Sequence, residues 1–310
     1  MSRAIPWLAV YGFGAHIKST QKKLIILEKG TVEEYSLEEI KHLLIVGGHN
    51  LNSTTISHLL KNGSFISFFE PDGTPVGVLQ PFGQTNNTQI QRLQEDLPRY
   101  RYAITLAQAS LKSRMIAIER LQEERGLTLL YEGELQILHN ALHDIEYLVK
   151  LDEIRRLSDV TKNMYYEILS RDIPKCLDFR RRTERPQYDP VNAMFSFGYA
   201  MLFGNCCVSV IGARLNPDFG LLHDGAGSLV RDFIEPFKAG MIDPVVCSIA
   251  RGTLKPEEFE QTPSRCMLSD SLIKHLISAF RNTIDNQKLD GQVNNFLQAI
   301  QKREDFTVMY

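Results

Sequence analysis

The sequence predicts an α+β fold, with a small β-rich N-terminal domain followed by a larger all-α C-terminal domain. Its 310 residues exceed the usual size of one domain, so two domains are expected. The apolar pattern also changes along the chain, from a period of two residues to one of about 3.6. The change falls at the polar stretch PFGQTNNTQ. We therefore expect a β-rich domain over residues 1–80, a linker over 81–89 and a helical domain over 90–310.

Short apolar runs separated by polar turn residues predict paired strands in the first 36 residues. The run HLLIVGG, from His42 to Gly48, is rich in β-branched and apolar residues and predicts a further strand. Asn52 can cap a short helix that ends at Gly63. Pro71-Asp72-Gly73 is typical of a turn between two more strands, because glycine tolerates a positive φ. No charge excess marks this domain as a phosphate binder.

Beyond the linker, apolar residues recur at helical spacing almost to the end of the chain. We expect helices over 100–124, 132–149, 153–170, 191–213, 228–238 and 269–284. Ser228 is the expected N-cap of the fifth. From Gln287 onward the apolar periodicity weakens, so we expect the C-terminal residues to fray.

The helix expected over 191–213 is long and apolar enough to raise the question of a membrane span. Four polar side chains interrupt it, namely Asn192, Ser196, Asn205 and Ser209. Helices that are apolar on all sides also occur at the centre of helical domains. We therefore expect a buried core helix and no membrane association.

Composition narrows the class of protein further. The formal net charge of −2 excludes a uniformly basic nucleic-acid coat but leaves room for a local basic face. The N-terminus lacks the apolar run of a signal peptide. Five scattered cysteines without CxxC pairs favour reduced thiols in a cytoplasmic protein over a zinc ribbon or a disulfide framework.

A histidine and two carboxylates follow the central apolar segment. His223 lies in a glycine-flanked loop, and Asp232 and Glu235 stand three residues apart in the next expected helix, so they share one face. One imidazole and two hard oxygen ligands suit a divalent cation such as Mg²⁺ or Mn²⁺. A surface histidine beside a solvated helix face would give the same pattern, so the spacing leaves both interpretations open.

A basic run lies just upstream of the central helix, with arginines at Arg180, Arg181, Arg182 and Arg185. Arginine and lysine hold the phosphates of nucleic-acid backbones, so the run indicates a polyanionic substrate. A charged, solvated loop is equally compatible with the composition.

Three stretches resemble the integrase family of CRISPR adaptation. RRRTERPQYDPVNAMFSFGYAMLFGN is similar to the family's central helix, and LLHDGAGSLVRDFIEPFKAGMIDPVV is similar to the block that follows it. HLLIVGGHNLNSTTISHLLKNGSFISFFEPDGTPVG resembles the family's N-terminal domain. The resemblance covers nearly the whole chain.

This resemblance implies a metal-dependent DNA endonuclease and integrase subunit of spacer acquisition, which transfers strands onto double-stranded DNA. It also implies a homodimer formed largely through the N-terminal domains, and a small ferredoxin-like partner protein. By motif, the family's histidine ligand falls on His223 and its final acid on Glu235, with Asp232 beside it, around Mg²⁺ or Mn²⁺. The four arginines then become candidates for DNA-backbone contacts.

The family's third ligand, a glutamate, is where this sequence departs. In the family it opens a helix of the form EGxxARxYF, and Ser158 occupies its position here. A shift of one residue, anchored on Tyr166, would place Asp159 there instead. Serine's neutral hydroxyl is a much weaker Mg²⁺ ligand than a carboxylate. The chain is therefore either an active enzyme that uses a substitute ligand or a catalytically impaired DNA-binding or scaffold paralogue.

Overall fold

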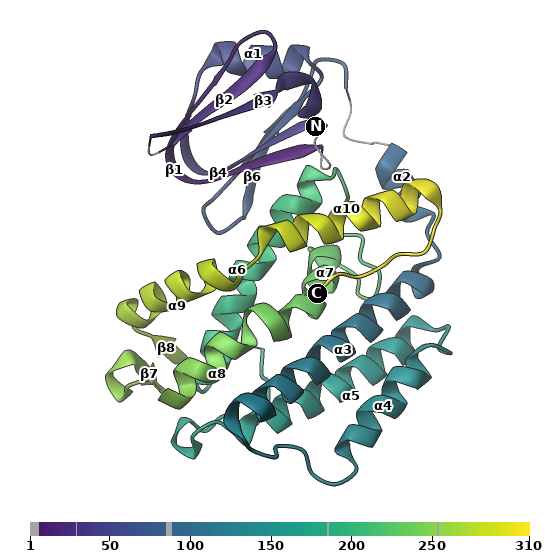
Figure 1. The fold of residues 1–310 in the computed structure, drawn as a ribbon, viewed down its shortest axis with the longest axis vertical. Helices are drawn as coiled ribbons and strands as arrows, with labels where there is room; N and C mark the ends of the chain where they lie inside the picture. The colour runs from purple at the N-terminus through teal and green to yellow at the C-terminus, as the bar shows by residue number, and fades with distance from the viewer. Residues whose placement is uncertain (1–5, 29, 85–88, 185, 253) are drawn as a thin grey trace.

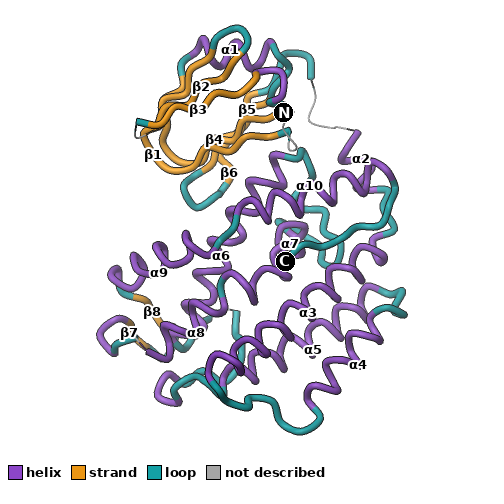
Figure 2. The backbone as a smooth tube through the Cα atoms, in the orientation of Figure 1, coloured by secondary structure: helices purple, strands orange, loops and turns teal. Residues whose placement is uncertain are grey.

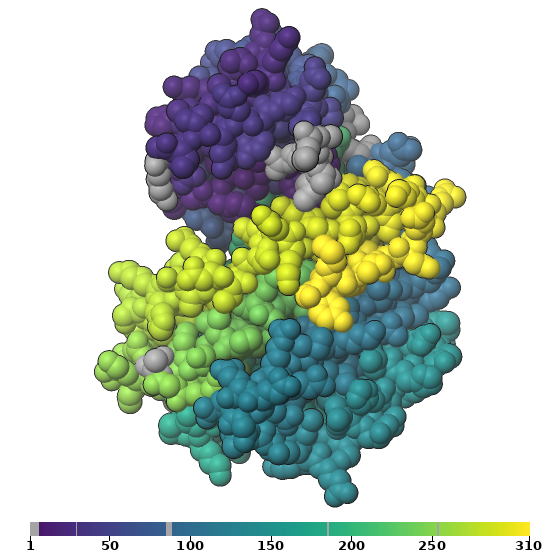
Figure 3. Space-filling view, viewed as in Figure 1, coloured from purple at the N-terminus to yellow at the C-terminus, as the bar shows by residue number. Residues whose placement is uncertain are grey.

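The computed structural model describes residues 6–28, 30–84, 89–184, 186–252 and 254–310. A six-stranded sheet sits on one end of a larger helical domain, so the predicted α+β fold is confirmed (Figure 1). The C-terminal helices α9 (Asp270–Thr283) and α10 (Asn286–Lys302) run across the helical domain on the face shown in Figure 3.

The sheet has the strand order β3-β2-β1-β4-β5-β6. Its strands are β1 (Trp7–Ser19), β2 (Lys23–Glu28), β3 (Thr31–Ser36), β4 (His42–Leu51), β5 (Phe65–Phe69) and β6 (Pro75–Leu79). The pairs β1–β4 and β4–β5 are parallel, and the other three pairs are antiparallel. A parallel pair needs a crossover, which α1 (Ser53–Lys61) supplies between β4 and β5. Asn52 caps α1 as expected, because its side chain accepts a bond of 2.8 Å from the Thr55 amide.

The two faces of the sheet pack differently, because successive side chains of a strand point to opposite faces. Leu43 and Ile45 of β4 belong to a small core that also contains Leu59 of α1. Their neighbours Leu44 and Val46 instead join the large core of the helical domain. The sheet is therefore part of the same hydrophobic unit as the helices beneath it.

The helices are shown in purple in Figure 2. Besides α1, α9 and α10 they are α2 (Gln89–Glu95), α3 (Arg99–Arg125), α4 (Glu134–Ile145), α5 (Leu151–Ser170), α6 (Pro190–Gly212), α7 (Ser228–Met241) and α8 (Asp243–Gly252). Short 3₁₀ turns lie at Leu37–Glu39, Lys175–Leu177 and Pro256–Glu258.

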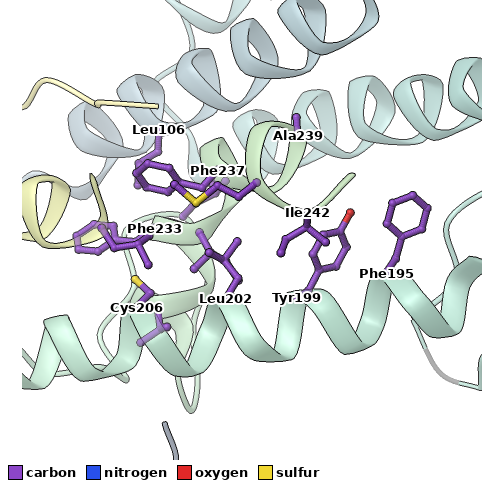
Figure 4. Close-up of a cluster of buried hydrophobic side chains, with 14 of the residues drawn as sticks. Leu106, Phe195, Tyr199, Leu202, Cys206, Phe233, Phe237, Ala239 and Ile242 are labelled. Atoms are coloured by element: carbon purple, nitrogen blue, oxygen red, sulfur yellow. The ribbon is translucent and has the colours of Figure 1, made fainter. Parts of the chain in front are cut away.

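Helix α6 is the centre of the helical domain. Asp189 caps it by accepting a bond of 2.8 Å from the Asn192 amide, and Pro190 occupies its first turn. In Figure 4 its side chains Phe195, Tyr199 and Leu202 lie in the cluster that also includes residues of α3 and α7. By length and composition α6 could cross a membrane, yet 56% of its most apolar window is buried within the fold.

Two stretches of the helical domain differ from expectation. A hairpin of β7 (Phe259–Gln261) and β8 (Cys266–Leu268) interrupts the helices. Helix α10 is complete where fraying was expected. Its buried apolar positions Leu289, Val293, Phe296, Leu297 and Ile300 keep helical spacing among many polar residues.

The expected N-cap at Ser228 is also wrong, because Gly227 occupies the cap position of α7 with a left-handed φ of 67°. The Ser228 hydroxyl instead bonds the loop before the helix. It accepts from the Gly220 amide at 2.9 Å and donates to the Asp218 carbonyl at 2.8 Å. The serine therefore fixes the loop that carries His223.

Candidate active site

A cavity of about 310 Å³ opens between α3, α5, α7 and the loop before α7. The structure brings the residues of the predicted metal site together around it, namely Ser158, Asp159, His223, Asp232 and Glu235. Residues that lie up to 77 positions apart in the sequence therefore share one site.

Asp232 is the buried anchor of the histidine loop. Its Oδ2 accepts bonds from the backbone amides of Leu221, Leu222 and His223 at 2.7, 2.8 and 3.2 Å. Its Oδ1 lies 2.5 Å from Nδ1 of His223. A neutral imidazole that donates from Nδ1 keeps a free lone pair on Nε2. Asp232 therefore orients His223 and leaves Nε2 as the atom available to a ligand.

Two arginines hold the same loop from outside. The Arg99 guanidinium donates to the His223 carbonyl at 3.1 Å and pairs with Asp224 at 2.8 Å. Arg155 donates to the Leu222 carbonyl at 2.5 Å and pairs with Asp224 at 2.9 Å. The Arg155 guanidinium is therefore engaged within the protein.

Glu235 lies between two cations. The Arg114 guanidinium is 2.8 Å from one carboxylate oxygen, and the Lys238 ammonium donates to the other. Burial alone would raise the pKa of Glu235, but Lys238, Arg114 and Lys162 outweigh burial and lower the pKa to about 2. Glu235 is therefore ionised at any physiological pH, with its charge balanced by protein groups.

The side chains of Ser158 and Asp159 differ in whether they already have a hydrogen-bond or ion-pair partner. The Ser158 hydroxyl is buried and has no hydrogen-bond partner within the described residues. Leaving such a group unpaired costs about 1–3 kcal/mol, so a ligand group there would be stabilising. The Asp159 carboxylate is 2.6 Å from the Lys162 ammonium on the next turn of α5. Asp159 thus reaches the cavity already paired.

The side chains present do not fit Mg²⁺ or Mn²⁺ as they stand. Asp232 uses both carboxylate oxygens inside the protein, and Ser158 offers only a neutral hydroxyl. The Glu235 and Asp159 carboxylates are already paired with cations of the protein. Nε2 of His223 remains as a free strong donor, which is fewer than these hard cations usually require. Across the described chain, no group of three or more His, Cys, Asp and Glu side chains is placed to hold a metal ion.

Arg182 of the basic run turns inward. Its guanidinium lies 3.0 Å from Oδ1 of Asn192 and 2.8 Å from Oγ of Ser196, and it stands 5.4 Å from the centre of the Tyr199 ring. These contacts join the basic loop to the start of α6. Arg182 therefore has a structural position whether or not it also meets DNA.

The other arginines of the run face solvent or lie outside the description. Arg180 is exposed and 3.3 Å from Asp178, an ion pair whose partners are both largely in water. Arg181 is exposed, and its guanidinium has no partner among the described residues. Arg185 lies outside the described residues. DNA binding by this loop stays a prediction.

Sequence reasoning missed the four cations that line the cavity, Arg114, Lys162, Arg231 and Lys238. A signal for Arg114 existed, since it follows Ala107 and Ser110 at spacings of seven and four on one face of α3. Small residues along a helical stripe leave room for a cavity, and the arginine at its end, 6% exposed, marks a charge that needs a partner.

A larger cavity, of about 530 Å³, lies elsewhere between α3, α8 and α10. Asp243 is at its edge, and its carboxylate accepts bonds from the Tyr165 hydroxyl at 2.9 Å and the Tyr199 hydroxyl at 2.5 Å. Burial raises the pKa of Asp243 to about 6, although the hydrogen bonds from the two tyrosines act in the opposite direction and lower this pKa. The Tyr199 ring also stands 4.8 Å from the Lys238 ammonium, so this network lies directly behind the candidate site.

Comparison with known proteins decides the family. The family model described as CRISPR associated protein Cas1 matches residues 8–282. The chain belongs to the Cas1 family. A Methanospirillum hungatei protein with the provisional name CRISPR-associated endonuclease Cas1 2 is 40% identical over 299 residues, covering 96% of this chain and 99% of the relative. A Thermus thermophilus CRISPR-associated endonuclease Cas1 1 is 28% identical, covering 87% and 84%.

Several solved structures share the fold of this chain. A casposase bound to integration product superposes with a TM-score of 0.82 at 19% identity, covering 98% of each chain. A Cas1 protein from Thermotoga maritima gives a TM-score of 0.73 at 16% identity, covering 95% of this chain and 96% of the other. A chain of a partial Cas6-RT-Cas1–Cas2 complex gives 0.81 at 19% identity, covering 98% of each.

Proposed function

We propose that this chain acts in CRISPR spacer acquisition as an integrase-type subunit that binds double-stranded DNA. Membership of the Cas1 family supports the process. Fold-level relatives that are bound to an integration product or assembled with Cas2 support DNA and a small protein as partners. The cavity supports the location, since the oriented His223 and the ionised Glu235 face the same space.

We further propose that metal-dependent nicking and strand transfer are weak or absent in the protein as it stands. The observation that carries this proposal is the unpaired Ser158 hydroxyl, which lines the cavity with His223 and Glu235. The motif resemblance assigns the family's glutamate to this position. The Asp159 carboxylate of α5 is paired with Lys162, so a divalent cation has too few free strong ligands to bind tightly. The subunit would then contribute DNA binding and assembly rather than catalysis.

Ser158→Glu tests the missing ligand. The substitution adds a carboxylate to the cavity, so Mn²⁺ affinity should rise roughly 10-fold or more. Isothermal titration calorimetry, or the electron paramagnetic resonance signal of free Mn²⁺, measures this affinity. Duplex nicking should rise with it if the rest of the site is intact. Ser53→Glu, which adds the same charge at an exposed position of α1, should change neither. A wild-type protein that already binds Mn²⁺ tightly and cuts DNA well would contradict this assignment.

A second candidate is an active enzyme in which Asp159 supplies the carboxylate that is missing at Ser158. Its support is that Asp159 already lines the cavity, although its oxygen pairs with Lys162. In that case the wild type should nick duplex DNA in Mn²⁺, and Asp159→Ala should abolish the activity. If Ser158→Glu gains Mn²⁺ binding but no nicking, the impaired-subunit proposal stands and more than one position has changed.

A further inference from the structure

The outward face of α9 carries a cluster of hydrogen-bond donors. It is separate from the candidate-site cavity and from the basic loop that begins at Arg180. The opposite face of the helix fixes its orientation, because Leu272, Leu276 and Phe280 are fully buried at four-residue spacing. The Phe280 ring packs so closely on α6 that a Cβ at Gly198 would lie 2.8 Å from it. The outward face of α9 therefore cannot rotate away from solvent without breaking the core.

This outward face lines a shallow open hollow of about 340 Å³. Its residues are Lys274, Ile277, Ser278, Arg281 and Asn282. Four of the five carry N–H or O–H donors, and none is acidic. Lysine, arginine, serine and asparagine are among the side chains that contact DNA phosphates. Lys274 and Arg281 are two helical turns apart, roughly 10 Å, which corresponds to about three nucleotides along one strand.

The two cations are available for an outside anion. Both are exposed, and within the described residues neither Lys274 nor Arg281 has an ion pair or a side-chain hydrogen bond. By contrast, Arg114 and Arg155 are each bound to carboxylates of the protein. A pair of unpaired cations with hydroxyl and amide donors between them is complementary to a row of phosphates.

The hairpin that precedes α9 connects it to the basic loop. The Cys266 amide donates to the Gln187 carbonyl at 2.7 Å, and the Gln261 side chain donates to the Tyr188 carbonyl at 2.7 Å. In Figure 1 the β7–β8 hairpin lies beside α9. The loop that begins with Arg180 and Arg181 is thus hydrogen-bonded to the hairpin from which α9 starts.

We propose that the α9 face, defined by Lys274, Ser278, Arg281 and Asn282, binds the phosphodiester backbone of DNA. This inference rests on the proposed DNA-binding function and adds a surface to it. The contacts are to phosphates, so the face fixes the position of the duplex and does not select its sequence. It works independently of any divalent cation in the cavity, because the hollow is lined by α9 alone.

The test compares two double variants of the full-length protein. Lys274→Gln with Arg281→Gln neutralises the α9 face. Lys112→Gln with Arg120→Gln removes the same charge from exposed positions of α3. Binding of a fluorescent duplex is measured in EDTA over a range of salt concentrations. The α9 variant should bind roughly 10-fold more weakly near 0.1 M salt, and its slope of log affinity against log salt should fall by about 1–2. The α3 variant should keep the wild-type slope.

The possible results distinguish failure of the α9 proposal from failure of the proposed DNA-binding function. If the wild type binds duplex and the α9 variant binds with unchanged affinity and slope, the α9 proposal fails while the DNA-binding function stands. Equal losses in both variants would also overturn it, because the effect would then be one of net charge alone. If the wild type does not bind duplex at all, the proposed function fails and the α9 proposal fails with it. Circular dichroism spectra that match the wild type exclude misfolding as the cause of a loss.

Discussion

Single residues of the helical domain show that carboxylates close in space have different roles. Asp232 is buried and accepts from three backbone amides, so it shapes the histidine loop. Glu235 faces the cavity with a pKa lowered to about 2. Asp243, deeper in the core, has a pKa raised to about 6 by burial. Desolvation and nearby cations act in opposite senses on a carboxyl group, and their balance decides which of these groups is charged.

Asp243→Asn should remove a pH dependence of stability. The folded-state pKa is raised, so the stabilising contribution of the protonated group is complete below about pH 4 and is lost as pH rises through about 6. Asparagine is always neutral and can still bond the two tyrosine hydroxyls. Between about pH 5 and pH 7.5, the free energy of unfolding of the wild type should fall relative to that of the variant by on the order of 1 kcal/mol.

Urea unfolding of both proteins at the two pH values measures this difference. Asp305→Asn, at a side chain 84% exposed, is the matched control and should follow the wild type. If the free energy of unfolding depends on pH in the same way for wild type and Asp243→Asn, ionisation of Asp243 does not destabilise the folded protein.

At the scale of elements, the contact between the sheet and α6 depends on a helical glycine. Gly204 lies against the turn between β5 and β6, and a Cβ there would stand 1.7 Å from the Asp72 carbonyl oxygen. The turn itself forms as expected from the sequence, with Gly73 at a φ of 86° and the Asp72 side chain accepting from the Thr74 amide. The sequence predicted the turn, but only the tertiary structure shows that it packs on α6.

Gly204→Ala should therefore destabilise the protein, although alanine is normally the better helix former. The added methyl group must push the β5–β6 turn off α6, so the free energy of unfolding should fall by more than ~1 kcal/mol. Gly240→Ala in α7 is the matched control. Nothing lies within 4 Å of its added Cβ, so it should raise stability by about 0.5–1 kcal/mol. Thermal unfolding of both variants gives the comparison, and equal shifts of the same sign would contradict the close approach at Gly204.

At the scale of the whole molecule, the two edges of the sheet are protected to different degrees. The edge strand β3 carries Glu33 and Glu34, charges that discourage pairing with another chain. The edge strand β6 is uncharged, with the sequence PVGVL, and every residue in it is exposed. Val76 and Val78 are 64% and 43% exposed. An uncharged apolar edge of this kind favours association, so we expect the homodimer to form through β6.

Light scattering after gel filtration at micromolar concentration measures the oligomeric state. The wild type should elute as a dimer, and Val76→Lys with Val78→Lys should convert it to a monomer by placing like charges at the edge. Val32→Lys, on the exposed β3 edge, should leave the dimer intact. A monomeric wild type would contradict the predicted dimer. If the β6 variant remains a dimer, the interface does not lie at β6.

The sequence by itself determined the elements whose signals are local. Capping at Asn52, the turn at Gly73 and the long apolar run of α6 follow from neighbouring residues, because caps, turns and periodicity are short-range properties. The family motifs also assigned Ser158, His223 and Glu235 to one predicted site, and all three line the same cavity. Three misses, the β7–β8 hairpin, the complete α10 and the cap of α7, occur where local signals were weak or where a side chain has a distant partner.

Only the tertiary structure decided how the charges are paired. Arg114 and Glu235 are 121 residues apart, and Arg99 and the His223 carbonyl are 124 apart, so no local pattern links them. Arg182 looked like the other arginines of its run, yet it bonds Asn192 and Ser196 while Arg181 stays exposed. The residue type fixes which ionisable group is present, but its partner, its burial and hence its pKa and charge depend on which helices pack around it.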